Sequence, residues 1–235
     1  MSPSSSMSGI QALLPIKHLT GVKTRLGNIL SAEERRQLVR AMAEDVVAAL
    51  KATKGLAGIS VVSHDTSVAS WAKSHDLDLI DDSSASGLSS AIGLAAHRSS
   101  EAGAAAILVV LADTPLATAN DFEALIEAHN KADDPAHLIL SPSRDDDGSN
   151  CLLVAPPGAM TFHYGPGSAR AHSDEARGAG LTVAQLKRPG IAHDIDTEAD
   201  LRDLIASTGM LDGHSRTSQF LTTSGIAARL AQKKL

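Results

Sequence analysis

The chain has 235 residues, of which 43% are hydrophobic and 20% are charged, so it can bury a substantial core and is expected to be globular. Aromatic residues make up only 2%, which disfavours RNA-binding sheets that stack bases on aromatic rings. Because 27 Asp and Glu outnumber 21 Lys and Arg, the net charge is −6, and nucleic acids and anionic membranes are unfavourable partners.

The N-terminus lacks the basic start and the apolar run of a signal peptide, and no stretch of the chain approaches about 18 consecutive apolar residues. The sequence therefore predicts a cytoplasmic protein with a disordered leader over 1–9, one domain over 10–222 and a peripheral C-terminal tail over 223–235. The single cysteine, Cys151, cannot form an intrachain disulfide.

Apolar runs of strand length alternate with longer segments of helical period, a pattern typical of a mostly parallel sheet covered by helices. The strands are expected at 11–16, 58–63, 77–81, 106–111, 137–141, 151–154 and 181–187. The helices are expected at 32–52, 65–75, 87–101, 119–131, 168–178 and 198–206, with one more near the C-terminus. Ser31 and Glu34 predict a capping box for the first helix, and its buried stripe is Leu38, Met42, Val46 and Leu50.

Several familiar motifs are absent from the chain. No GxGxxG sequence follows the first strand, and the glycines and lysines do not have the spacing of a P-loop. No GxSxG elbow or HExxH helix occurs, and the histidines are scattered without the spacing of zinc ligands. Dinucleotide binding, Walker-type phosphate binding and zinc hydrolysis are therefore disfavoured.

Three aspartates follow apolar strands, at the edge where open α/β sheets bind ligands. Asp113 comes directly after one strand, and Asp194 and Asp196 share one side of an extended segment because residues i and i+2 point the same way. Carboxylates without His or Cys favour Mg²⁺ over zinc. The structural alternative is that Asp113 begins a turn before Pro115 and that Asp196 or Thr197 caps the next helix.

A basic loop follows the first strand, with Lys17, Lys23, Thr24 and Arg25 close together in an otherwise acidic chain. Such a loop suits a triphosphate, because Arg gives forked contacts and Lys a mobile charge. The alternative is an ordinary solvated loop.

The segment His163-Tyr164-Gly165-Pro166-Gly167-Ser168 leads into a predicted helix. Its glycines allow close backbone approach, and a serine at a helix start would leave free N–H groups beside its hydroxyl, as in an anion site. A plain turn with an N-cap is the alternative. The polar run 141–150, which precedes the strand at 151–154, predicts an insertion or an active-site loop.

Together these motifs resemble the nucleotidyltransferases that make the guanylylated phospho-acid precursor of coenzyme F(420), the 2-phospho-L-lactate and phosphoenolpyruvate guanylyltransferases. The resemblance runs from about Ala12 to Leu221. Its motifs are Pro-Ile-Lys and Val-Lys-Thr-Arg-Leu within 15–26, Ser-Ala-Glu-Glu-Arg at 31–35, Ala-Asp-Thr-Pro-Leu at 112–116, Asp-Gly-Ser-Asn at 147–150, Tyr-Gly-Pro-Gly-Ser at 164–168 and Asp-Ile-Asp-Thr at 194–197.

The resemblance implies a single-domain α/β fold of the GT-A-like nucleotidyltransferase type, a mostly parallel mixed sheet flanked by helices, with GTP and Mg²⁺ as ligands. It implies metal binding by Asp113, Asp194 and Asp196, and phosphate binding by Lys17, Lys23 and Arg25. Acceptor contacts are implied for Ser149, Gly165 and Ser168. Nucleoside contacts are implied for Gly87, Ser89 and Ser90, although relatives tend to carry Asn where this chain has Ser89.

The reaction implied by the resemblance is transfer of GMP from GTP to 2-phospho-L-lactate, phosphoenolpyruvate or 3-phospho-D-glycerate, with release of pyrophosphate. The hydroxyls of Ser89, Ser90 and Ser149 favour 3-phospho-D-glycerate or phospho-lactate. A transferase that takes the activated product and a second copy in a homodimer are the implied protein partners. The alternatives are a transferase of the same fold acting on molybdopterin or a sugar phosphate, and a noncatalytic nucleotide-binding protein.

Overall fold

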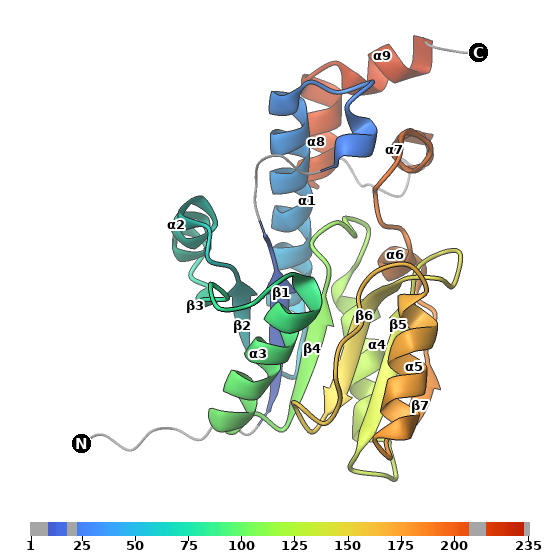
Figure 1. The fold of residues 1–235 in the computed structure, drawn as a ribbon. Coiled ribbons are helices and arrows are strands. Elements are labelled where there is room, and N and C mark those ends of the chain that lie inside the picture. The colour runs from blue at the N-terminus through green and yellow to red at the C-terminus, as the bar shows by residue number, and fades with distance from the viewer. Residues whose placement is uncertain (1–8, 18–22, 207–214, 233–235) are drawn as a thin grey trace.

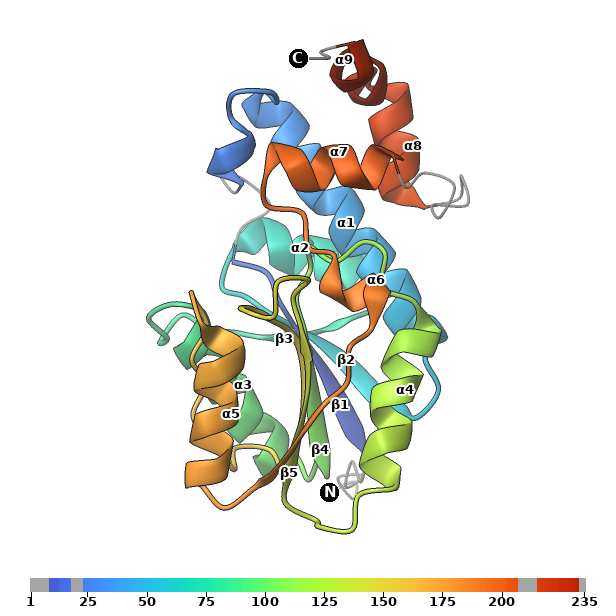
Figure 2. The ribbon, with the colours of Figure 1, turned by 90° about the vertical axis from the view of Figure 1, so that its right-hand side faces the viewer.

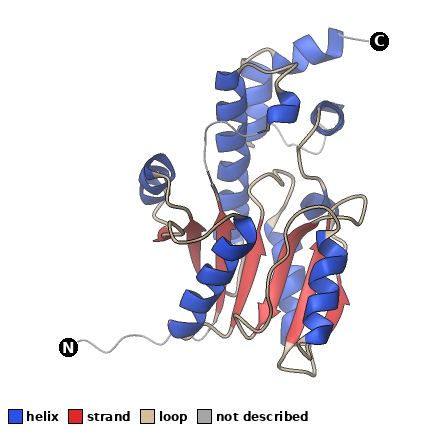
Figure 3. Cartoon of the chain, viewed as in Figure 1, coloured by secondary structure: helices blue, strands red, loops and turns tan. Residues whose placement is uncertain are grey.

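The computed structural model describes residues 9–17, 23–206 and 215–232. Residues 1–8 of the expected leader and 233–235 of the expected tail lie outside these ranges. Within them, one seven-stranded sheet has helices on both faces (Figure 1; Figure 3). No helix in the described ranges is both long and apolar enough to cross a membrane.

The strands are β1 (Ile10–Pro15), β2 (Leu56–Val62), β3 (Asp78–Ile80), β4 (Ala106–Val110), β5 (His137–Pro142), β6 (Ser149–Ala155) and β7 (Thr182–Gln185). The helices are the 3₁₀ turn η1 (Thr24–Leu26), α1 (Ala32–Ala52), α2 (Thr66–Ser74), α3 (Leu88–Glu101), α4 (Ala119–Asn130), α5 (Ser168–Gly178), α6 (Pro189–Ala192), α7 (Glu198–Ala206), α8 (Arg216–Thr223) and α9 (Ile226–Gln232).

The sheet has the order β3-β2-β1-β4-β6-β5-β7. Neighbouring strands are parallel except at β6, which is antiparallel to β4 and to β5. The predicted mostly parallel, mixed α/β sheet is therefore confirmed. Because β6 runs backwards, its first residues, Ser149 and Asn150, lie at the edge where the parallel strands end.

Side chains alternate between two apolar layers, as the period of a strand requires. In β4, Leu108 and Val110 belong to the cluster that includes α1 and α4, and Ile107 and Val109 belong to the cluster that includes α3 and α5. Figure 2 shows α3 and α5 on one side of the sheet and α4 on the other. Both faces are buried, which accounts for the nearly unbroken apolar sequence of the central strands.

The predicted elements are present, and most boundaries differ by one or two residues. The capping box of α1 is confirmed, since Glu34 N–H donates to Ser31 Oγ at 3.2 Å and Ser31 N–H donates to Glu34 Oε2 at 2.7 Å. The run 141–150 is a β-hairpin rather than an insertion, because Pro142 pairs with Ser149 and both strands extend into it. Sequence reasoning missed α6, a single turn too short to show a helical period.

The C-terminal segment packs against the domain. The Asp45 carboxylate on α1 accepts the N–H groups of Arg216 and Thr217 at 2.7 and 2.9 Å, which satisfies the start of α8. In α9, Ile226 and Leu230 are buried in the same cluster as the α1 side chains. The expectation of a peripheral tail from residue 223 is wrong for this helix, because apolar residues four positions apart give it one buried face.

Shortening Leu230 tests whether α9 belongs to the cooperative core. Because Leu230 is only 2% exposed, Leu230→Ala is expected to lower the free energy of unfolding by about 2–4 kcal/mol, measured by urea denaturation. The exposed Gln232→Ala on the same helix should change it by less than about 0.5 kcal/mol. Equal stability of the Leu230 variant and the wild type would place α9 outside the cooperative unit.

Candidate active site

Two adjoining cavities open at the carboxyl edge of the sheet, beside β1 and β4. The Lys23 cavity, of about 470 Å³, is lined by Lys17, Lys23 and Arg25 after β1 and by Asp113 after β4. The Ser149 cavity, of about 590 Å³, is lined by the start of β6 and the loop before α5. Arg25, Leu88, Leu111, Asp113 and Asp196 line both. The pair lies at the point where successive strands are added on opposite sides of β1, which is where open α/β sheets bind ligands.

One backbone hydrogen bond brings the predicted aspartates together. Ile195 N–H donates to the carbonyl oxygen of Asp113 at 3.1 Å, so Asp194 and Asp196 lie on either side of that contact. The side chain of Ile195 is fully buried in the core, as the i, i+2 pattern predicts. Asp113 and the segment containing Asp194 and Asp196, which are about 80 residues apart in the sequence, therefore lie side by side.

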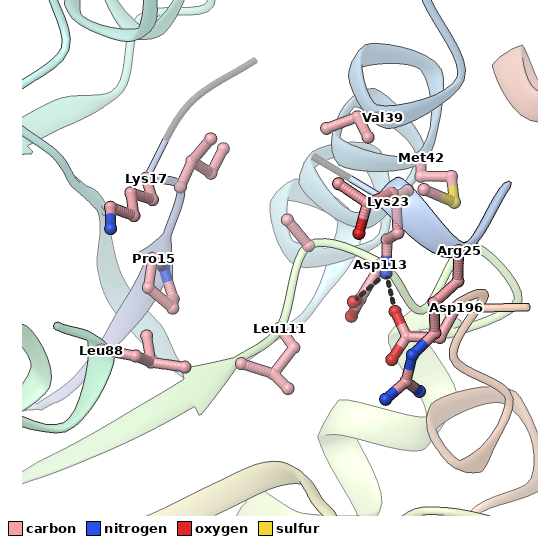
Figure 4. A pocket seen from close by; sticks show the side chains of 13 residues that line it. Pro15, Lys17, Lys23, Arg25, Val39, Met42, Leu88, Leu111, Asp113 and Asp196 are labelled. Atoms are coloured by element: carbon pink, nitrogen blue, oxygen red, sulfur yellow. Dashed lines mark hydrogen bonds and ion pairs between the residues drawn. The ribbon is translucent and has the colours of Figure 1, made fainter. Parts of the chain in front are cut away.

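The Lys23 ammonium bridges two of these carboxylates. Its Nζ lies 2.6 Å from Asp113 Oδ2 and also donates to Asp196 Oδ1 (Figure 4). Burial lowers the pKa of Lys23, but the charges and hydrogen bonds of Asp113 and Asp196 outweigh that effect and raise it. The backbone of Lys23 is left-handed, with φ at 59°, a conformation uncommon for a residue other than glycine.

Asp194 is held from the other side by Asn150. Asn150 Nδ2 donates to Asp194 Oδ1 at 3.0 Å and to the Ile191 carbonyl oxygen at 2.9 Å. Burial, followed by the charges of Asp113 and Asp196, raises the pKa of Asp194 despite this hydrogen bond. Asn150 is the last residue of the Asp-Gly-Ser-Asn motif at 147–150, and the sequence predicted no role for it. Its position after a polar run and before an apolar strand was the available signal.

The carboxylates partly fit a divalent cation. In the described part of the chain, no group of three or more His, Cys, Asp or Glu side chains converges closely enough to hold a metal ion, and Lys23 lies between Asp113 and Asp196. However, Asp113 Oδ1 is buried and has no hydrogen-bond partner among the residues that the structure describes. The described lining of the Ser149 cavity also contains six Asp and only two Arg. An anionic ligand would therefore need additional cations there.

The cationic residues are divided between the sides of the Lys23 cavity. Arg25 lies on the side of Asp113 and Asp196, whereas Lys17 is exposed on the opposite side, near Pro15 (Figure 4). The structure thus brings Lys23 and Arg25 to the carboxylates but leaves Lys17 apart from them. Residues 18–22, between Lys17 and Lys23, lie outside the described residues.

The three predicted acceptor contacts, Ser149, Gly165 and Ser168, all line the Ser149 cavity. Ser149 N–H donates to Ser168 Oγ at 2.9 Å. The expectation of free N–H groups at the start of α5 is wrong, because those of Gly167 and Ala169 donate to Asp147, at 2.8 and 2.9 Å. The hydroxyls of Ser149 and Ser168 are therefore better placed to meet a ligand than the helix N-terminus.

The three residues predicted to contact the nucleoside do not line a common cavity. Gly87, the N-cap of α3, lines a third cavity of about 310 Å³ together with Asp82, whereas Ser89 and Ser90 line none of the three cavities. Ser89 Oγ accepts the Tyr164 N–H at 2.9 Å, and Ser90 Oγ donates to the Gly87 carbonyl oxygen at 3.3 Å. The Ser89 hydroxyl therefore links α3 to the loop at Tyr164, whereas the Ser90 hydroxyl makes a local bond within the first turn of α3.

The helix-cap alternative holds for Thr197. Its Oγ1 accepts the Asp200 N–H at 3.3 Å, and the Asp200 carboxylate accepts the Thr197 N–H at 2.8 Å, which caps α7. Asp196, which comes immediately before it, uses its carboxylate on Lys23 instead. The segment 194–197 thus contributes both to the site and to the start of a helix.

Comparison with known proteins identifies the family of the chain. The family model for guanylyl transferase CofC like proteins matches residues 10–233. A phosphoenolpyruvate guanylyltransferase of Conexibacter woesei is 35% identical over 218 residues, which cover 91% of this chain and 97% of that protein. A 2-phospho-L-lactate guanylyltransferase of Methanothermobacter thermautotrophicus is 29% identical over 194 residues, 83% of each chain.

Among solved structures, a protein assigned as a nucleotide-diphospho-sugar transferase from Desulfovibrio desulfuricans G20 superimposes with a TM-score of 0.77. The match covers 95% of this chain and 98% of that protein at 17% sequence identity. At this identity the likeness concerns the fold, and it confirms the single-domain nucleotidyltransferase architecture expected from the sequence.

Replacing Asp194 tests the electrostatic strain in this cluster. Because the folded protein raises the pKa of Asp194, its charged form opposes folding at neutral pH, and Asp194→Asn should stabilise the protein there by roughly 0.5–1 kcal/mol. The gain should shrink as the pH falls and Asp194 becomes protonated in the wild type. Urea denaturation from pH 7 to pH 4 measures this, with the exposed Asp133→Asn as control. A loss of stability at pH 7 would contradict the assignment.

Proposed function

The chain belongs to the guanylyl transferase CofC like family and is a guanylyltransferase, and from that membership we propose that it transfers GMP from GTP to phosphoenolpyruvate in the biosynthesis of coenzyme F(420). The observation that carries the proposal is the pair of cavities with Asp113 and Asp196 between them. A triphosphate in the Lys23 cavity and an acceptor in the Ser149 cavity would bring their phosphates together at these two residues.

In the proposed reaction, an acceptor phosphate oxygen forms a bond to the α-phosphorus of GTP. The bond from that phosphorus to the oxygen bridging the α- and β-phosphates breaks, and pyrophosphate leaves with the electron pair. A phosphate monoester is already largely ionised at neutral pH, so no general base is required. The protein supplies orientation and countercharge, the latter from Lys23 and Arg25.

Mg²⁺ belongs to this proposal, with Asp113 and Asp196 as ligands and Asp194 beside them. When bound, it would neutralise triphosphate charge and stabilise the pyrophosphate leaving group. The unpartnered Asp113 Oδ1 and the excess of Asp in the Ser149 cavity support a cation at this position. The Lys23 ammonium is held beside Asp113 and Asp196, where the phosphates are proposed to meet. With GTP bound, it would pair with phosphate oxygens.

Phosphoenolpyruvate is the acceptor favoured by the name of the 35% identical relative. The serine hydroxyls favoured 3-phospho-D-glycerate or phospho-lactate in the sequence, but in the folded protein two of the three lie away from the proposed acceptor. Ser90 donates its hydroxyl to the Gly87 carbonyl oxygen, and Ser89 lines none of the three cavities. Only Ser149 among the three serines faces the proposed acceptor.

The decisive experiment is incubation of the purified protein with GTP, Mg²⁺ and each of the three phospho-acids in separate reactions. A partner transferase and its deazaflavin acceptor trap the activated product, which is then identified by mass spectrometry. Formation of the product carrying the phosphoenolpyruvate-derived group is expected. Parallel reactions replace the phospho-acid with molybdopterin or a sugar phosphate, and turnover only in these would support the same-fold alternative. Calorimetric GTP binding without any turnover would support a noncatalytic protein.

Replacing Asp113 tests its role at the reacting phosphates. Asp113→Asn is expected to lower kcat by roughly 100-fold or more while leaving the circular dichroism spectrum intact, because it removes a charge held at the meeting point of two substrates. Asp174→Asn, the same change at an exposed site on α5, should leave the rate unchanged. A normal rate for the Asp113 variant would contradict the assignment.

Removing the metal tests the charge argument separately from turnover. With excess chelator, GTP and phosphoenolpyruvate together should raise the melting temperature little, whereas adding Mg²⁺ should give an increase that depends on ligand concentration. The expected cause is the excess of acidic side chains in the Ser149 cavity. An equal increase with and without Mg²⁺ would argue against a metal in the site.

A further inference from the structure

We propose that His172 is a positioning residue for the acceptor: it fixes the Ser149 hydroxyl so that its hydrogen is presented to an anionic oxygen of the phospho-acid. The inference rests on the proposed function, because it takes the Ser149 cavity as the acceptor site. His172 does not line this cavity among the described residues, so its role would be to act through Ser149.

The tautomer of His172 follows from its contacts. The side chain is fully buried on α5, one helical turn after Ser168. Its Nε2 accepts the backbone N–H of His163 at 2.8 Å, so Nε2 carries no hydrogen. Burial, and to a lesser extent the neighbouring His163, lowers the pKa of His172 to about 4, so the ring is neutral at assay pH. The single ring hydrogen must then be on Nδ1.

The tautomer in turn orients Ser149. His172 Nδ1 lies 2.8 Å from Ser149 Oγ, and because Nδ1 carries the hydrogen, the serine oxygen is the acceptor in this bond. The hydroxyl hydrogen of Ser149 then has no acceptor among the described residues. Since Ser149 lines the cavity, that hydrogen is available to a ligand, and a phosphate or carboxylate oxygen is the matching partner.

The same ring also supports Tyr164, a second residue that lines the cavity. The Tyr164 ring packs edge-on against it, with ring centroids 4.8 Å apart at an interplanar angle of 70°. The hydrogen bond from His163 N–H holds the start of the same loop, and Tyr164 N–H is anchored by Ser89. One neutral imidazole therefore sets the direction of the serine hydroxyl and also contacts the loop that contains His163 and Tyr164.

The test compares His172→Phe, which keeps an aromatic ring but removes both nitrogens, with His172→Asn, which keeps a donor near Nδ1. For His172→Phe, the KM for phosphoenolpyruvate is expected to rise about tenfold or more, and the KM for GTP to change less than about twofold. For His172→Asn, the KM for phosphoenolpyruvate should stay close to that of the wild type. His97→Phe, at an exposed position on α3, is the matched control and should leave both constants unchanged.

A double-mutant cycle separates positioning from general support. In a Ser149→Ala background, His172→Phe should raise the acceptor KM little further, because the hydroxyl it orients is already absent. The proposal would be overturned if the two substitutions raised the acceptor KM independently, so that their factors multiply. It would also be overturned if His172→Phe raised the KM values for GTP and for the acceptor equally. Absence of turnover by the wild type with every phospho-acid would instead refute the proposed function.

A measurement on the wild type keeps the inference testable if His172→Phe does not fold. Nitrogen-15 NMR of histidine-labelled protein at pH 7 should show His172 neutral and protonated at Nδ1, assigned by comparison with the spectrum of His172→Asn. A ring protonated at Nε2, or a cationic ring at this pH, would overturn the orientation of Ser149 derived above.

Discussion

The site depends on one constraint: three carboxylates are held close together although their charges repel. The hydrogen bond from Ile195 N–H to the Asp113 carbonyl oxygen fixes the two acidic segments side by side, and the buried Ile195 side chain anchors the second of them. The Lys23 ammonium between Asp113 and Asp196 offsets part of the repulsion. The remaining repulsion is visible in the raised pKa of Asp194, whose largest cause is burial. In a site under this electrostatic strain, an added cation would offset the remaining repulsion.

The reversed direction of β6 is the second requirement. If β6 ran parallel to β4, its first residues would lie at the far edge of the sheet from Asp113. Because it is antiparallel, Asn150 reaches Asp194, and Ser149 enters the cavity beside Asp113. The close pairing of the two proposed substrates thus follows from the direction of a single strand.

The sequence predicted the sheet and the acidic cluster because both depend on local patterns. Apolar runs identify buried strands, and the carboxyl ends of parallel strands share one edge, which places Asp113 after β4 as expected. The expectation that Asp194 and Asp196 also follow a strand is wrong, because α6 lies between β7 and these residues, and the hydrogen bond of Ile195 brings them to Asp113. The role of His172 was not predicted, although it lies one turn from Ser168. The tautomer of His172 follows from the hydrogen bond that the His163 N–H donates to it, and this bond forms only when the loop is folded. The engagement of the α5 N-terminus by Asp147 likewise depends on the turn of the β5–β6 hairpin.

The neutral hydroxyl donors of the Ser149 cavity suit the proposed reaction. A phosphate that must act as a nucleophile loses reactivity when a fixed guanidinium neutralises it. Of the two Arg in the described lining of the Ser149 cavity, Arg25 also lines the Lys23 cavity, where the triphosphate is proposed to bind. The guanidinium of Arg144 pairs with Asp203 at 2.8 Å and with Asp200 at 3.2 Å on α7. The hydroxyls of Ser149 and Ser168 instead offer neutral donors, and each oxygen already accepts a hydrogen bond from the protein. In the proposed reaction, such donors would orient the acceptor anion while leaving its charge on the attacking oxygen, and countercharge would be concentrated on the triphosphate.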